Sequence, residues 1–176
     1  MKTTGTKHKP KNGNVPARSK PPQVDRETGA NEGAHTSLRL WLRLLTCATM
    51  IENRVRVKLR EDFETTLPRF DLMAQLARHP DGLKMGDLSK LMMVTGGNVT
   101  GITDQLEKDG LVERLTLPGD RRAWQVRLTP KGQEVFEAMA VVHEAWIVNW
   151  MSSLNGDEQH TLHSLLGKLK QGVREI

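Results

Sequence analysis

The fold is decided by residues 92–114, which have the sequence MMVTGGNVTGITDQLEKDGLVER. Val99, Ile102 and Leu106 recur at spacings of three and four, and this period predicts a helix with one buried face. Thr95, just before the pattern, is a residue type that caps helix N-termini. We therefore expect a helix that starts directly after Thr95.

Three glycines occupy the start of this expected helix. Gly96, Gly97 and Gly101 each cost up to about 1 kcal/mol relative to alanine in a helix interior. Their clustering at the start of one helix indicates that a backbone must approach something closely. Gly110 is expected to end the helix, since glycine is common just past a helix C-terminus.

Two further helices are expected before it. A short one within 84–94 has the apolar face Leu88, Leu91 and Met92, and a tight break follows it. An earlier helix follows Thr66 and ends before the breaker residues 79–82. Its expected inward face consists of Phe70, Met73, Ala74 and Ala77.

The first helix is expected to begin near Thr36 and to be apolar over a wide arc. Two neighbouring stripes follow the helical period. They consist of Leu38, Trp41, Leu42 and Leu45, and of Leu40, Leu44, Cys47 and Ile51. So wide an apolar surface requires cover on more than one side, and a partner subunit is the favoured cover in a small domain.

A hairpin and two long helices are expected in the last third of the chain. Residues 111–128 predict two short strands around a charged turn at 117–122. Thr129 suits the start of one helix, and Asn155 with Glu158 resembles a capping box at the start of the other. The apolar faces of these helices are Val135, Met139, Val142, Trp146 and Trp150, and Leu162, Leu165, Leu166, Leu169 and Val173.

This order of elements predicts a mostly α-helical protein, an α+β winged helix-turn-helix with about six helices and a two-stranded β-hairpin as the wing. Within a domain at 35–176, residues 84–131 form the winged helix-turn-helix. Residues 36–60 and 133–174, from both ends of the chain, form a helical dimerisation lobe.

The charge of the chain is concentrated at its start. The 176 residues have a formal net charge of +5, and residues 1–34 account for +4 of it, with seven basic and three acidic side chains. This segment has no Phe, Trp, Tyr, Leu or Ile, so we expect a disordered basic tail. It could contact phosphates nonspecifically or only solubilise the chain. The remainder is nearly neutral, so the basic pI of about 9.6 is no evidence that the domain binds nucleic acid.

Several classes of protein are excluded by patterns that the sequence lacks. No stretch approaches the roughly 18 apolar residues of a membrane span, and no apolar segment follows the basic N-terminus as in a signal peptide. Cys47 is the only cysteine, which excludes an intramolecular disulfide and favours a reducing cytosol. No zinc-protease, serine-hydrolase, Walker or dinucleotide motif is present, so we expect neither an enzyme nor a cofactor.

Four motifs resemble those of the MarR family. They lie at 66–72, 92–101, 109–114, and 120–122 followed by 126–132. The resemblance covers about residues 36–174. It implies a dimeric bacterial transcriptional regulator, located in the cytoplasm at the nucleoid, that often releases DNA when a small ligand binds. Repression is the commoner mode in that family.

The helix after Thr95 is expected to enter the major groove of DNA. The candidate contacts on and just before it are Lys90, Thr95, Gly97, Asn98, Thr100, Gly101 and Gln105. Hydroxyls suit phosphates, amide side chains suit the edge of adenine, and the glycines permit close approach. The alternative is that Thr95 only caps the helix and Asn98 is only solvated.

A second contact is expected at the hairpin turn. Asp120 and Arg122 lie two residues apart, so the carboxylate can hold the arginine extended, and an extended arginine suits a narrow minor groove. The resemblance implies that Arg122 enters this groove, with Asp120 orienting it and Arg121 adding a phosphate contact. The alternative is an exposed ion pair worth about 0–1 kcal/mol.

The resemblance also implies an effector pocket between the dimerisation helices and the DNA-binding lobe. Candidates for binding an aromatic carboxylate or its coenzyme A thioester are Trp41, Arg43, Arg69, His143 and Trp146. For the tryptophans, core packing is the favoured alternative.

Cys47 lies in an apolar stripe, so we expect a buried, inert thiol rather than a redox sensor. His160 and His163 lack a third ligand, and we expect no metal site.

The predicted partners are double-stranded DNA with a palindromic operator, a second copy of the chain as a homodimer, and a small-molecule effector, but no membrane. The competing hypothesis is a winged helix used for protein–protein contact, with the tail as a nonspecific nucleic-acid anchor. Arg121 and Arg122 argue against it, whereas the acidic Asp104 and Glu107 favour it.

Overall fold

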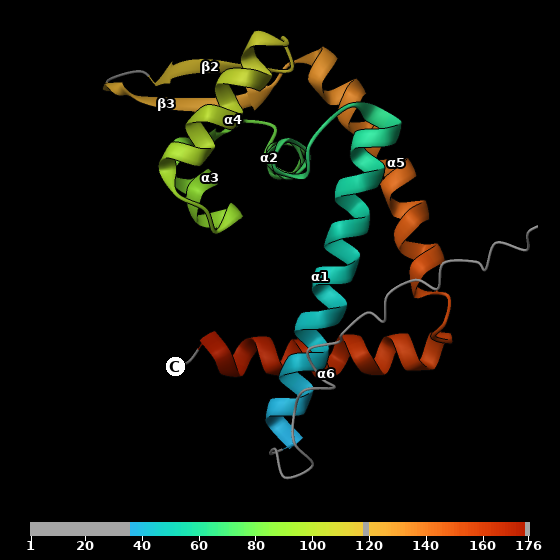
Figure 1. Ribbon diagram of the computed structural model, residues 1–176. Helices are drawn as coiled ribbons and strands as arrows, with labels where there is room; N and C mark the ends of the chain where they lie inside the picture. The colour runs from blue at the N-terminus through green and yellow to red at the C-terminus, as the bar shows by residue number, and fades with distance from the viewer. Residues whose placement is uncertain (1–35, 118–119, 175–176) are drawn as a thin grey trace, which may run out of the picture. The chain divides into compact units, whose positions relative to one another are not determined.

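The computed structural model describes residues 36–117 and 120–174, and the side chains of residues 117–123 lie outside this description, as does the expected basic tail. The elements of the described residues are α1 (Thr36–Phe63), α2 (Leu67–Ala77), β1 (Leu83–Lys84), α3 (Met85–Met92), α4 (Gly96–Lys108), β2 (Val112–Leu117), β3 (Asp120–Leu128), α5 (Pro130–Met151) and α6 (Gly156–Arg174) (Figure 1). The expected helices and hairpin are confirmed, whereas the short strand β1 was not expected. No helix within these residues has the length and apolar character needed to cross a membrane.

The chain divides into two compact units, and the boundary between them lies within α1, between Thr49 and Met50. Helix α2 is central to the second unit. Phe70, Leu72 and Met73 of α2 are buried, as is Leu76 at its last turn. The helix contacts α3, α4, α5 and β3, and Figure 1 shows it end-on beside α3 and α4. The predicted inward face of α2 omitted Leu72 and Leu76. It was too narrow because several other elements cover α2.

The sheet is antiparallel and has the strand order β1-β3-β2. Strand β3 begins at Asp120, so residues expected in the turn belong to a strand. Thr116 of β2 lies opposite Trp124 of β3, and Leu83 of β1 pairs with Val126 on the other side of β3. The predicted two-stranded wing is therefore part of a three-stranded sheet.

The three expected N-cap residues occupy the predicted positions, and two of them make side-chain capping bonds. Thr129 Oγ1 accepts a hydrogen bond from the Gly132 amide at 3.0 Å at the start of α5. The capping box of α6 is reciprocal, with 3.0 Å from the Glu158 amide to Asn155 Oδ1 and 2.8 Å from the Asn155 amide to Glu158 Oε2. Thr95 occupies the N-cap position of α4, which starts directly after it as expected, although the Thr95 side chain makes no capping hydrogen bond.

Several apolar side chains that we expected to be covered are exposed. Cys47 is exposed, which corrects the expectation of a buried thiol, and Leu91 is 45% exposed. In the described part of α1, no residue before Val55 is buried. Helix α6 has no buried residue, and its apolar face is open to solvent. The reason is that the helices of one chain do not cover all of its amphipathic faces.

Candidate nucleic-acid interface

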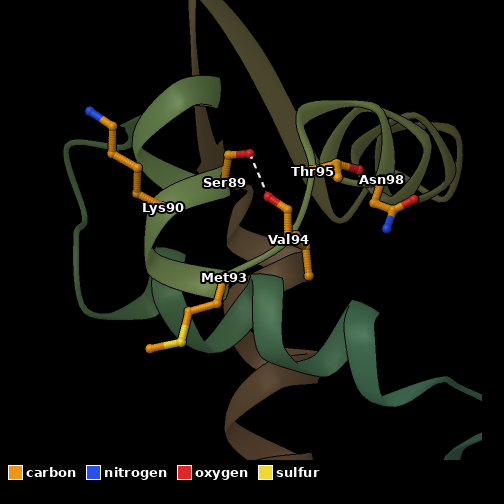
Figure 2. Close-up of a pocket in the computed structure, with 6 residues that line it drawn as sticks. All are labelled: Ser89, Lys90, Met93, Val94, Thr95 and Asn98. Carbon is orange, nitrogen blue, oxygen red and sulfur yellow. Dashed lines mark hydrogen bonds between the residues drawn. The ribbon is translucent and has the colours of Figure 1, made fainter. Parts of the chain in front are cut away.

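The turn between α3 and α4 is held by two hydrogen bonds between Ser89 and Val94. Ser89 Oγ donates to the Val94 carbonyl at 2.9 Å (Figure 2), and the Val94 amide donates to the Ser89 carbonyl at 3.1 Å. Met93, between them, adopts a left-handed conformation with φ of 55°. The turn thus fixes the start of α4 against the end of α3.

Helix α4 has one buried and one exposed side. Val99, Thr103 and Leu106 are fully buried, and Ile102 is partly buried. The exposed side contains the predicted DNA contacts of this region, namely Thr95, Gly97, Asn98, Thr100, Gly101 and Gln105. The structure therefore places these candidates on the accessible side of the helix.

Thr103 is a core residue that the sequence analysis missed. Its hydroxyl donates to the Val99 carbonyl at 2.8 Å, and this bond satisfies the polar group inside the core. The sequence could have predicted its burial only from its position, since Thr103 lies four residues after Val99 and three before Leu106 on the buried face of the helix.

A surface pocket of about 530 Å³ lies at the start of α4. It is lined by Ser89, Lys90, Met93, Val94, Thr95 and Asn98, and Figure 2 shows Thr95 and Asn98 on the α4 side with Lys90 and Met93 on the α3 side. Lys90 is extended, with its side chain 83% exposed and its ammonium 3.9 Å from Asp87. Met93 is 93% exposed, an apolar surface residue that the sequence analysis did not single out.

The glycines of α4 face open space. A Cβ built on Gly96, Gly97 or Gly101 has no heavy atom within 4 Å. The packing of the chain therefore does not require glycine at these positions.

The hydroxyl of Thr100 is already engaged, although the residue is exposed, because it donates to the Gly96 carbonyl at 3.0 Å. A phosphate would have to compete with this bond.

The predicted wing contacts can be located only by their backbone. Asp120, Arg121 and Arg122 form the first residues of β3, and their side chains lie outside the described residues. Their roles at the minor groove stay predictions.

The C-terminal half of α4 is anchored to the sheet by an arginine that the sequence analysis did not assign. Arg114 of β2 donates to Glu107 Oε2 at 2.6 Å and also pairs with Asp104. Its side chain is 22% exposed. Both acidic residues of α4 are thus engaged in holding the helix on the wing, which weakens their value as evidence for a protein-binding surface.

Arg69, an effector candidate, makes a structural ion pair with Asp109 at the end of α4. The hydrogen bond from Arg69 lowers the pKa of the Asp109 carboxyl below its usual value. Lys131 Nζ also donates to the Asp109 carbonyl at 2.9 Å. These contacts tie the end of α4 to the first turns of α2 and α5. The Arg69 Nε atom is buried without a partner among the described residues.

The other effector candidates fall into two groups. His143 and Trp146 belong to an aromatic cluster on α5, with 4.9 Å between the ring centroids of His143 and Phe70 and 6.2 Å between those of His143 and Trp146. Burial lowers the pKa of the His143 imidazole. Trp41 and Arg43 lie in the other compact unit of the chain. The packing of Trp146 favours the core role that we kept as the alternative.

A helix-turn-helix followed by an antiparallel hairpin defines a winged helix-turn-helix, a class of DNA-reading module. Residues 65–124 match the model of the MarR family. Over these residues the chain is similar to this family of transcriptional regulators, and the relatives below are similar over more of its length.

The relatives are named as regulators and not as enzymes. The transcriptional activatory protein BadR of Rhodopseudomonas palustris is 29% identical over 82% of this chain and 84% of its own length. A MarR family transcriptional regulator from Silicibacter pomeroyi is similar in structure, with a TM-score of 0.67 and 29% identity over 78% of this chain and 94% of its own. Sco3205 of Streptomyces coelicolor, solved in complex with DNA, has a TM-score of 0.69 at 24% identity over 79% and 89% of the two chains.

Proposed function

We propose that the chain is a homodimeric, sequence-specific DNA-binding regulator that occupies a palindromic operator in the bacterial cytoplasm and represses transcription. The observation that carries this proposal is the exposed side of α4, where polar side chains stand beside glycines that face open space. A helix with this surface can lie deep in a major groove. Relatives of the same fold, such as Sco3205, were solved with DNA bound.

The homodimer is supported by apolar faces that the chain leaves exposed. The face of α6 consists of Leu162, Leu165, Leu166, Leu169 and Val173, all exposed. On α5, Val141 is 70% and Val148 64% exposed. Burying such a surface contributes about 25 cal/mol per Å², and a second copy presents the same faces. We therefore assign residues 36–60 and 133–174 to dimerisation and residues 84–131 to DNA reading.

The wing provides the variant that tests DNA reading. We expect Arg122→Ala to weaken binding by about 1–3 kcal/mol while leaving the melting temperature unchanged. The assay is a fluorescence-anisotropy titration at fixed salt, on a duplex that the wild-type chain has selected from a random library. Arg78→Ala, an exposed arginine outside α4 and the wing, is the matched control and should bind like the wild type. Equal affinity of the Arg122 variant would refute the minor-groove role.

We further propose that a small effector, an aromatic carboxylate or its coenzyme A thioester, releases the DNA. The aromatic cluster around His143 and the Arg69 Nε atom, which is buried and has no partner in the described parts of the chain, are the features that suit such a ligand. Addition of benzoate or benzoyl-coenzyme A to the protein–DNA complex should lower the anisotropy. A reporter gene behind the selected operator distinguishes repression, which we propose, from activation, the role in the name of BadR.

A further inference from the structure

A second surface hollow lies between α4 and the wing. It has a volume of about 550 Å³ and is lined by Met85, Thr100, Asp104, Glu107, Arg114 and Trp124. Thr100, Asp104 and Glu107 form one stripe of α4, since they are spaced by four and three residues. Arg114 and Trp124 come from β2 and β3. The hollow thus runs along α4 on the side that faces the sheet.

Trp124 is the large aromatic residue of this hollow. It shares a strand face with Val126, which is fully buried, yet Trp124 itself is 45% exposed. Within the described residues no acceptor takes the hydrogen of its indole Nε1. A half-exposed indole with an available N–H is suited to a surface that is apolar on one side and hydrogen-bonding on the other.

The charged residues that line the hollow are two acidic residues and one arginine. Asp104 and Glu107 both pair with the guanidinium of Arg114. These three side chains together have a net charge of −1. The other residues that line the hollow, Met85, Thr100 and Trp124, have no charge. An anionic ligand is therefore disfavoured beside Asp104 and Glu107, and the uncharged Thr100 and Trp124 are the lining residues that can donate a hydrogen bond to it.

The duplex places such an anion beside the hollow. When a recognition helix lies in the major groove and a wing lies in the adjacent minor groove, one sugar–phosphate backbone passes between the two. Thr100, which lines the hollow between α4 and the wing, is also one of the candidate DNA contacts on α4. A deoxyribose is apolar on its carbon face, and a phosphate oxygen accepts a hydrogen bond.

We propose that Trp124 contacts this backbone, with its ring packed on a deoxyribose and its Nε1–H donated to a phosphate oxygen. The contact carries no sequence information, so Trp124 sets the register of α4 and the wing on the duplex. The inference rests on the proposed DNA-binding function and adds to it a third contact, between the recognition helix and the wing.

Trp124→Phe is the variant that tests the proposal, because phenylalanine keeps a ring in the hollow but removes the N–H. We expect affinity for the selected duplex to fall about tenfold, the scale of one hydrogen bond to a charged group. Arg78→Ala, at an exposed arginine outside α4, the wing and the helices assigned to dimerisation, is the control and should retain wild-type affinity. Thermal melting of both variants should match the wild type.

A set of duplexes with a single neutral methylphosphonate identifies the phosphate. One such substitution in each half-site should weaken the wild type, and the same substitution should cause no further loss in the Trp124→Phe chain. Equal affinity of the Trp124→Phe and wild-type chains, or equal sensitivity of both to every methylphosphonate, would overturn the proposal. If the wild-type chain selects no duplex at all, the proposed function itself fails, and the contact with it.

Discussion

Gly101→Ala should make the protein more stable and a poorer DNA binder at the same time. Gly101 lies in the interior of α4, is exposed, and has no heavy atom within 4 Å of a built Cβ. Alanine in a helix interior is about 1 kcal/mol more favourable than glycine. For a chain of 176 residues, this gain corresponds to a rise in melting temperature of about 2–4 °C.

The same methyl group should interfere with DNA. If the open space at Gly101 is the space that a duplex occupies, the added Cβ acts as overpacking of a close interface, which costs about 1–3 kcal/mol. This corresponds to a loss of affinity between about fivefold and 150-fold. The assays are thermal melting of the free protein and an anisotropy titration on the selected duplex.

A matched glycine separates the two effects. Gly167 of α6 also has no heavy atom within 4 Å of a built Cβ, so Gly167→Ala should raise the melting temperature without weakening DNA binding. Wild-type affinity of Gly101→Ala would refute the idea that α4 needs glycine for close approach. A fall in its melting temperature would refute the assignment of open space at this position.

Two further predictions concern stability. Gly132→Ala should destabilise the protein by about 3 kcal/mol or more, because its Cβ would lie 1.9 Å from the Leu111 carbonyl oxygen; a wild-type midpoint in urea unfolding would contradict this. Burial lowers the pKa of His143, so at pH values below about 6.5 the unfolded chain binds more protons at this side chain than the folded one. Stability should therefore fall as the pH is lowered from 7 through 6.5, and His143→Gln should show a smaller fall; parallel stability curves for the two chains would refute the assignment.

The elements of this protein are predictable because their signals are local. The spacing of Val99 and Leu106 specifies a helix, and the bonds that close the capping box of α6 join residues three apart. Such interactions depend on neighbours within a turn or two, so the printed sequence contains both partners. The polar, glycine-rich surface of α4 was predictable for the same reason, since a helix of known period exposes known positions.

Tertiary structure decided the partners of individual side chains. Arg69 was a candidate for a ligand, but α2 places it against Asp109, forty residues away. From the sequence, Trp124 was an apolar strand residue like Val126. In the structure Val126 is buried in the core, whereas Trp124 lines the α4–wing hollow and is half exposed.

The sequence by itself determined the order of helices and strands, the caps of α5 and α6, and the polar side of the recognition helix. Only the tertiary structure decided which amphipathic faces stay open, including the stripe that contains Cys47 and the face of α6. The physical reason is that a helical period specifies that a face is apolar, whereas its burial depends on whether another element of the chain lies against it.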